Sequence, residues 1–85
     1  MDLREVFATN FRRLRREKGL SQYDLAYEAE VSRSYLSQLE RGTYYASPKI
    51  IGRLAETLGV EPAEFLKLPS GSGNPDRGAT TEPGR

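Results

Sequence analysis

The sequence has no cysteine and no histidine in its 85 residues, and it has no tryptophan and a single methionine. Without cysteine and histidine the chain forms no disulfide and lacks the usual protein ligands of structural zinc and haem. It also lacks cysteine nucleophiles and histidine-based catalytic triads. The other polar residues show no spacing that would hold a nucleophile beside a base of lowered pKa. We therefore expect no enzymatic activity, no cofactor and no metal site.

Long apolar runs are missing as well, since no stretch approaches the ~20 apolar residues needed to span a bilayer. Hydrophobic residues make up 36% of the chain, and the mean hydropathy is -0.67. The N-terminus carries charges at Asp2, Arg4 and Glu5, where a signal peptide has an apolar run behind a basic start. We expect one small domain with no membrane partner, located in the cytoplasm.

The charges are nearly balanced overall but unevenly distributed along the chain. The net charge of +1 and the pI of about 8.0 do not indicate a strongly basic nucleic-acid-binding module. Residues 1–18 nevertheless carry six basic and three acidic side chains, whereas residues 54–68 carry one basic and three acidic side chains. This separation suits one-sided binding to a polyanion, although a solvated helix surface accounts for a basic run equally well.

Glycine, proline, serine and threonine dominate the C-terminal residues 69–85. This segment contains no large apolar side chain. Such a composition cannot bury enough surface to offset the entropy of ordering. We predict a domain over residues 1–68 followed by a disordered tail over residues 69–85.

The domain is predicted to be all-α with five helices, because apolar residues recur at helical spacing between strong boundary signals. Leu3, Phe7, Phe11 and Leu14 form one such stripe, and Gly19 favours the left-handed backbone that ends a helix over residues 2–18. The buried sides of the next three helices are predicted to contain Leu25, Ala26, Tyr35, Leu36, Leu39, Ile51, Leu54, Ala55 and Leu58.

Three serines are predicted to begin the middle helices. Ser21 opens a capping-box pattern for a helix to Ala29, and Ser32 is a suitable N-cap for a helix ending at Gly42. Ser47 precedes a proline, which is favoured at the first helical position, and the helix that follows should end at Gly59. A short fifth helix is predicted after Pro62, and it carries Phe65 and Leu66.

The most informative stretch is residues 22–41, QYDLAYEAEVSRSYLSQLER. A helix of about eight residues, a break of about three and a second helix form the helix-turn-helix arrangement, in which the second helix is free to enter a DNA major groove. Four apolar side chains would hold the angle between the two helices, and the small Ala26 lies where they approach each other. The four are Leu25, Val31, Leu36 and Leu39.

The chain resembles the Cro/CI-type (XRE) helix-turn-helix family of phage repressors and small bacterial regulators. The resemblance covers about residues 6–66 and rests on RRLRREKGLSQ, Leu25-Ala26, VSRSYLSQLERG, and LAETLGV followed by EFL. It implies a lambda-repressor-like fold in a bacterial or phage-encoded regulator that binds specific sequences of double-stranded DNA and associates with the nucleoid when bound.

By the resemblance, the outward residues of the second motif helix contact DNA bases. Arg33 offers two parallel donors to guanine O6 and N7, and Gln38 matches the N6 and N7 edge of adenine. A good bidentate contact supplies roughly 1 to 3 kcal/mol of discrimination. The full set of expected base contacts is Arg33, Gln38, Ser34, Ser37 and Ser32.

The resemblance also implies residues that meet the phosphate backbone. Gln22 lies at the start of the first motif helix, where the backbone N–H groups favour an anion. The expected phosphate contacts are Gln22, Tyr27, Arg41, Tyr44 and Tyr45. Amphipathic packing explains the tyrosines equally well. Arg15 and Glu40 are expected to form a partly buried structural ion pair.

Three positions depart from the family pattern. Glu30 occupies a turn position usually held by glycine, and a positive φ there would cost roughly 1 kcal/mol. The loop over residues 43–46 is often basic in the family but lacks a basic residue here, which puts its usual DNA contacts in doubt. Pro48 replaces a common apolar residue and is interpreted as a helix start.

A homodimer is expected, because a single module of this size buries too little surface for the usual specific affinity. Two copies on a two-fold-related operator would roughly double the contact energy. The expected interface residues are Ile50, Phe65, Leu66 and Leu68. The sequence suggests no small-molecule ligand, so autoregulation through protein concentration is expected, as in phage switches and the controller proteins of restriction-modification systems.

Two other functions remain open at the level of the sequence. The same fold serves as the antitoxin of toxin-antitoxin pairs, in which case an unrelated small protein would copurify with the chain. It also serves as a protein-interaction module without DNA binding, which a gel shift with the DNA upstream of its own coding frame would detect.

Overall fold

A computed structural model describes residues 1–68 of the chain, and the predicted tail lies outside these residues. The described part forms four α-helices and one terminal 3-10 helix, which confirms the all-α prediction. The short fifth element is a 3-10 helix rather than an α-helix. The elements are α1 (Leu3–Lys18), α2 (Gln22–Ala29), α3 (Arg33–Glu40), α4 (Pro48–Leu58) and η1 (Pro62–Leu66).

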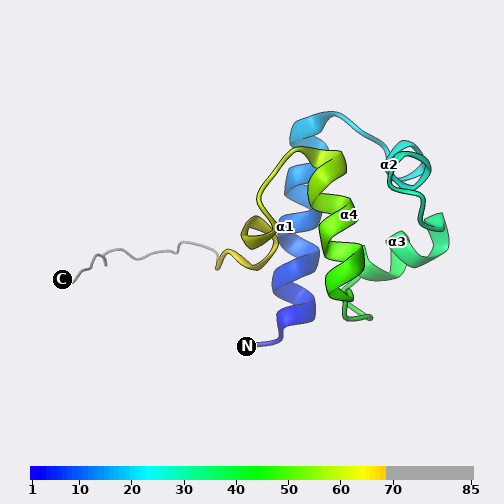
Figure 1. Cartoon of the computed structure of the whole chain (residues 1–85). Coiled ribbons are helices and arrows are strands. Elements are labelled where there is room, and N and C mark those ends of the chain that lie inside the picture. The colour runs from blue at the N-terminus through cyan, green and yellow to red at the C-terminus, as the bar shows by residue number, and fades with distance from the viewer. Residues whose placement is uncertain (69–85) are drawn as a thin grey trace.

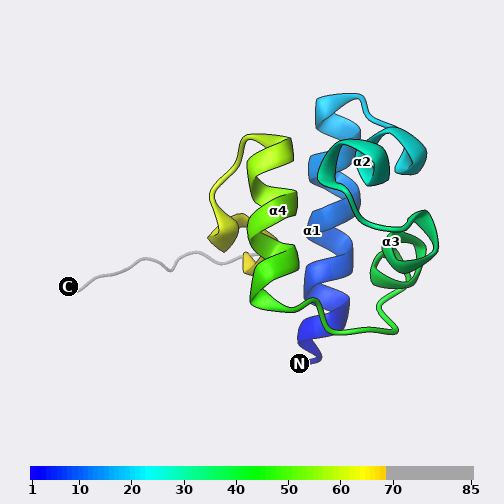
Figure 2. The ribbon, with the colours of Figure 1, turned by 45° about the vertical axis from the view of Figure 1, so that its right-hand side comes forward.

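The two longest helices form the centre of the molecule. α1 and α4 lie beside each other in both views (Figure 1, Figure 2), and they contact each other directly. α2 and α3 lie on one side of this pair, whereas η1 packs against α1 on the other side (Figure 1). Of the two helices of the predicted motif, α2 therefore packs against α4 and α3 packs against α1.

The helix boundaries follow the capping signals of the sequence. The hydroxyl oxygens of Ser21, Ser32 and Ser47 accept hydrogen bonds from the backbone N–H groups of residues 24, 35 and 50, at 3.0, 3.0 and 3.2 Å. Gly19 and Gly59 end α1 and α4 in the left-handed conformation, with φ of 78° and 69°. These contacts satisfy backbone groups that a helix end leaves without an internal partner. The three predicted N-caps are thus confirmed.

The core is built around three aromatic rings. Phe7, Phe11 and Phe65 have ring centroids 4.9 to 6.3 Å apart, and aliphatic side chains from all four α-helices surround them. The core cluster matches most of the predicted apolar stripes and consists of Phe7, Phe11, Leu14, Leu25, Ala26, Ala29, Leu36, Leu39, Leu54, Ala55, Leu58 and Phe65. Tyr35 and Ile51, also predicted for the core, are half-buried and pack against its edge.

Two predictions about apolar residues are wrong. Phe65 has no exposed surface, because it fills the space beside Phe7 and Phe11, so its side chain is not available to a dimer interface. Leu3 belongs to the predicted apolar stripe of the first helix, but 46% of its surface is exposed. It lies in the first turn of α1, at the edge of the region that the other helices cover.

A buried polar side chain fastens the C-terminal end of the domain to α1. The Nδ2 of Asn10 donates hydrogen bonds to the backbone oxygens of Phe65 and Lys67, at 2.9 and 2.8 Å. These bonds satisfy backbone groups at the end of η1 and hold Phe65 in the core.

None of the helices in residues 1–68 combines the length and the apolar composition that a membrane-spanning helix needs.

Candidate nucleic-acid interface

The turn between α2 and α3 contains Glu30, which occupies the position where glycine was expected from the family resemblance. Glu30 has φ of 60° and ψ of 44°, which is the left-handed conformation, so the condition under which a non-glycine residue carries a backbone cost is met here. Its neighbour Val31 donates a backbone hydrogen bond to Ala26 at 3.0 Å, and Arg53 of α4 donates to the Glu30 carbonyl at 3.3 Å. The turn is therefore fixed from both sides, and it sets the direction in which α3 leaves α2.

The predicted ion pair between Arg15 and Glu40 is present. The guanidinium Nε of Arg15 donates to Oε2 of Glu40, and its Nη2 donates to Oε1 at 3.2 Å. The side chains of Arg15 and Glu40 are only 14% and 7% exposed. Because Arg15 also donates to the Leu20 carbonyl at 2.8 Å, the pair joins α1, the start of the motif and the end of α3.

The side chain of Gln22 takes part in the same network. Its Nε2 donates a hydrogen bond to Oε1 of Glu40 at 3.0 Å. The first residue of α2 is thereby tied to the last residue of α3. An amide nitrogen carries two protons, so this bond leaves one donor at the N-terminus of α2 for another acceptor.

The expected base-contacting residues share the solvent side of α3. Leu36, Leu39 and Glu40 face the protein interior, whereas Arg33 and Ser34 are exposed. Ser37 and Gln38 are half-buried. Within residues 1–68, Arg33 forms no hydrogen bond or ion pair through its guanidinium group, which leaves all five donors for an external ligand. The hydroxyl of Ser32 caps α3, as described above.

One of these side chains already has a partner within the protein. The Oγ1 of Thr43 lies 2.7 Å from Oε1 of Gln38 and 2.9 Å from its backbone oxygen. This side-chain contact was not predicted from the sequence, because it depends on the path of the chain after Gly42. Thr43 therefore holds the Gln38 side chain at the C-terminal end of α3.

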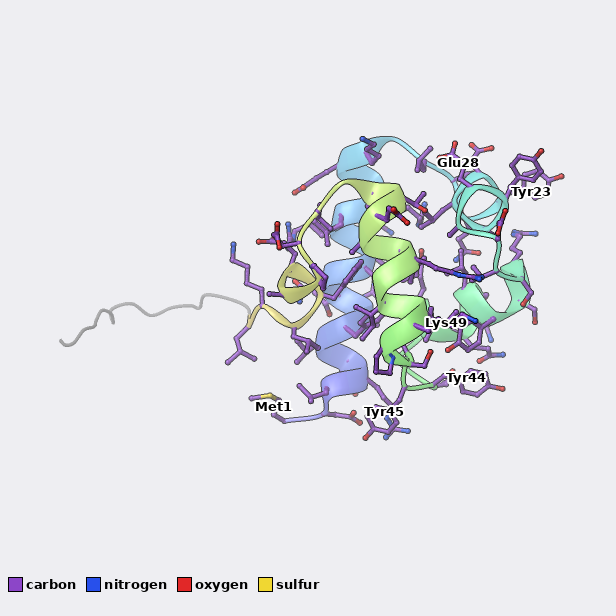
Figure 3. All side chains as sticks on the ribbon, viewed as in Figure 1. Met1, Tyr23, Glu28, Tyr44, Tyr45 and Lys49 are labelled. Carbon is purple, nitrogen blue, oxygen red and sulfur yellow. The ribbon has the colours of Figure 1, made fainter. Side chains whose placement is uncertain are left out.

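The aromatic residues of the loop after α3 lie at one end of the molecule, where Figure 3 labels Tyr44 and Tyr45. The ring of Tyr44 lies 6.0 Å from that of Tyr35, and it is about half exposed. Tyr45 is more exposed, and the guanidinium of Arg4 lies 5.0 Å from its ring centroid. Both hydroxyl groups belong to exposed side chains, as does that of Tyr27 on α2.

The Arg4 guanidinium beside Tyr45 is oriented by an acidic partner. Its Nε and Nη2 donate to the two carboxylate oxygens of Asp2 at 3.1 and 2.9 Å. The side-chain hydrogen bond from Arg4 lowers the pKa of Asp2 below its ordinary value, and the same bond raises the pKa of Arg4. The Asp2 carboxylate also caps α1 through the backbone N–H of Arg4.

A basic residue near α3 was missed at the level of the sequence. Lys49 lies in the first turn of α4 and points toward the side of the molecule that carries α3 (Figure 3). It is exposed, like Arg33 and Arg41. The loop over residues 43–46 lacks a basic residue, and Lys49 places an ammonium group just beyond it. The signal was available, because Ser47-Pro48 fixes the helix start and therefore the position of the next residue.

Taken together, α3 presents guanidinium, amide and hydroxyl groups to solvent while its other side is held in the core. Such groups form hydrogen bonds with base edges and phosphate oxygens. Among residues 1–68, no group of three or more acidic side chains is arranged to hold a metal ion.

Comparisons with known proteins agree with this geometry. A family model described as helix-turn-helix (HTH_3) matches residues 11–65. An HTH-type transcriptional regulator of Sinorhizobium fredii is 42% identical over 66 residues, which cover 78% of this chain and 86% of the relative. The control protein C.BamHI of Bacillus amyloliquefaciens is 36% identical over 66 residues, covering 76% of this chain and 82% of that protein.

A solved structure gives the same result in three dimensions. The restriction-modification controller protein C.AhdI of Aeromonas hydrophila is 40% identical and superposes with a TM-score of 0.70. The match covers 73% of this chain and 94% of that protein. The likeness therefore extends over nearly the whole of a protein of comparable size.

Proposed function

Since this chain belongs to the XRE-type helix-turn-helix (HTH_3) family of DNA-binding transcriptional regulators, we propose that it acts as a homodimer on a two-fold-related operator and regulates its own expression. A protein with this role acts where the chromosome lies, in the bacterial cytoplasm. It carries out no catalysis, and it needs no cofactor or small-molecule ligand.

The observation that carries the proposal is the solvent face of α3. Its polar side chains project from a helix that the Arg15–Glu40 pair and a buried apolar side hold in place. A recognition helix needs this combination, because side chains on a rigid element reach the base edges at a defined depth and angle. We assign base contacts to Ser32, Arg33, Ser34, Ser37 and Gln38.

Phosphate contacts fix the position of the protein on the duplex. We assign them to the residues that the resemblance implied, Gln22, Tyr27, Arg41, Tyr44 and Tyr45, and we add Lys49. Arg41 and Lys49 supply positive charge beside α3, where the neighbouring loop supplies aromatic side chains and no basic group. Each ammonium or guanidinium group that meets a phosphate releases a counterion, which makes binding dependent on salt.

Dimerisation is supported by apolar side chains that the domain leaves exposed. Leu66, Leu68 and Leu3 are 44%, 54% and 46% exposed. Ile50 is half-buried, so only part of its side chain is available to a partner. With Phe65 withdrawn into the core, we place the interface on Leu66, Leu68 and Leu3, with Ile50 at its margin. Burial of such a surface in a second copy removes apolar area from water.

Binding to the DNA upstream of the protein's own coding frame tests the proposal. In a gel-shift titration we expect a discrete complex with this DNA and a much weaker one with a scrambled fragment of equal length. Sedimentation should give the mass of a dimer for the free protein. Equal binding to both fragments would contradict a sequence-specific regulator.

The contribution of the apolar surface is tested with Leu66→Lys. This variant should sediment as a monomer at concentrations where the wild-type protein is dimeric, and it should lose affinity for the upstream fragment. Tyr23→Lys is a matched control, since Tyr23 is exposed on α2 and points away from η1 (Figure 3). It should remain dimeric. A dimeric Leu66→Lys variant would contradict the proposed interface.

A further inference from the structure

The first turn of α1 packs against the chain that follows α3. A β-carbon at Gly42 would lie 3.5 Å from the backbone oxygen of Arg4 and 3.7 Å from the Cα of Glu5. Three residues after Gly42, the ring centroid of Tyr45 lies 5.0 Å from the Arg4 guanidinium. Although Arg4 is distant from α3 in the sequence, its side chain therefore shares a surface with the loop over residues 43–46.

Two contacts fix the orientation of the Arg4 guanidinium. Its Nε and Nη2 donate to the Asp2 carboxylate at 3.1 and 2.9 Å, so one edge of the planar group is held. The group lies over the Tyr45 ring, at a distance where a cation is attracted to an aromatic face. Because these contacts exist before any ligand binds, the side chain loses little conformational entropy when it binds one.

The other edge of the guanidinium retains hydrogen-bond donors. The bonds to Asp2 use two of its five N–H groups, which leaves both protons of Nη1 and one proton of Nη2. These three form no hydrogen bond within residues 1–68, and the side chain is 37% exposed. Two neighbouring N–H groups of an arginine match two oxygens of a phosphate group.

Phosphate is the acceptor that DNA would bring to this place. An α-helix with its side chains is about 10 to 12 Å wide and fills a major groove about 12 Å wide. The chain that leaves α3 at Gly42 then passes beside a phosphate strand. Tyr44 and Tyr45 offer neutral hydroxyl groups there (Figure 3), and the loop over residues 43–46 has no charged residue of its own. Arg4 adds positive charge at this point from a different helix.

We propose that Arg4 binds a phosphate of the DNA backbone beside the loop over residues 43–46. The ligand is the phosphodiester backbone of double-stranded DNA, so the contact strengthens binding to all sequences alike. The inference rests on the proposed DNA-binding function and adds a residue of α1 to the surface that meets DNA. Asp2 and Tyr45 hold the guanidinium, and Arg4 itself touches the phosphate.

The test compares Arg4→Met with Arg13→Met, each in the full chain, on the DNA upstream of the coding frame. Arg13 is a matched control, because it also lies on α1, is 39% exposed and has an acidic partner, Glu64, in η1. Arg4→Met should weaken binding about five- to tenfold per bound subunit near 0.1 M salt. It should also reduce the slope of log K against log salt by about 0.9 per subunit. Arg4→Lys, which keeps the charge, and Arg13→Met should both retain the wild-type slope.

Uncharged phosphates locate the contact on the operator. Replacing single phosphates by methylphosphonates should weaken wild-type binding wherever a phosphate is contacted. In Arg4→Met, one of these positions in each half-site should become insensitive, whereas Arg13→Met should show the wild-type pattern. A purely structural role of Arg4 would lower the affinity without changing the salt slope or this pattern. Sedimentation and circular dichroism verify that each variant is dimeric and helical, and Arg4→Gln repeats the test with a polar side chain.

The outcomes separate this inference from the function on which it rests. The inference is wrong if both Arg4→Met and Arg4→Gln keep the wild-type salt slope, or if no methylphosphonate position becomes insensitive. It is also wrong if Arg13→Met reduces the slope as much, since the effect would then belong to the overall charge of the protein. Failure of the wild-type protein to distinguish its upstream DNA from a scrambled fragment would instead contradict the DNA-binding function.

Discussion

At the scale of single residues, Glu30 has the least favourable backbone conformation in the described chain. It is the one residue other than glycine with a positive φ among residues 1–68. A left-handed conformation costs an L-residue roughly 1 to 2 kcal/mol, part of which glycine loses again through its greater freedom when unfolded. Glu30→Gly should therefore raise the free energy of unfolding by about 1 kcal/mol, measured by urea denaturation.

Glu28→Gly is the matched control, since it places glycine two residues earlier at an exposed helical position of α2. There the substitution should lower the free energy of unfolding by about 0.5 to 1 kcal/mol. A Glu30→Gly variant that is destabilised like the control would show that the Glu30 side chain, rather than its backbone, stabilises the turn.

The Arg15–Glu40 pair gives a second prediction at this scale. Replacing Arg15 by methionine leaves the Glu40 carboxylate in a site where its side chain is 7% exposed. Breaking a buried pair in this way costs about 3 kcal/mol or more, whereas an exposed pair contributes less than about 1 kcal/mol. We therefore expect Arg15→Met to lower the free energy of unfolding, measured by urea denaturation, by about 3 kcal/mol or more. The double variant Arg15→Met/Glu40→Met should lose less than the sum of the single variants.

Local signals explain which residue-level features could be predicted. The serine caps, the positive φ of Glu30 and the Arg15–Glu40 pair each follow from a short pattern or from the family resemblance. The burial of Phe65 could not be predicted, because it depends on how the chain returns across α1. The exposure of Leu3 has the same origin, since helical period fixes a face but not how far other elements cover it.

At the scale of elements, the account depends on α3 as a helix that reads bases on one face. Arg33 projects from its first turn, and Arg41 follows its last residue. Arg33→Ala should therefore weaken binding most at one base pair, by roughly 1 to 3 kcal/mol of lost discrimination. Arg41→Ala should weaken binding to all sequences alike and reduce the salt dependence, measured as the slope of log K against log salt, by about 1.

Fluorescence titrations with a panel of single-base operator variants at several salt concentrations distinguish these two effects. Both arginines are exposed, one at each end of α3, so each variant serves as the control for the other. Should both substitutions weaken every sequence equally, the assignment of Arg33 to a base contact would be wrong.

The elements themselves were largely predictable, and the differences have physical reasons. All four α-helices end within two residues of the predicted boundaries, since serine, proline and glycine act locally on the backbone. The last element is a 3-10 helix, because the five residues Pro62–Leu66 provide too few internal bonds to establish an α-helix, and Asn10 bonds to its backbone instead. The contact between Thr43 and Gln38 could not be predicted, because it depends on the path that the loop takes after α3.

At the scale of the whole molecule, two surfaces lie on different sides of the central pair of helices. α3 lies on one side of α1 and α4, and η1, with the exposed Leu66, lies on the other (Figure 1). One subunit can therefore meet DNA with α3 while a second copy covers its apolar surface. Two recognition helices related by a two-fold axis reach successive major grooves when they are about 34 to 36 Å apart.

A hydroxyl-radical footprint of the wild-type protein on the DNA upstream of its coding frame tests this account most directly. The account predicts two protected segments of related sequence and opposite orientation, with centres about one helical turn, or ~10 base pairs, apart or a multiple of it. Protection of a single segment without two-fold symmetry, or no protection at concentrations where the protein is dimeric, would contradict it.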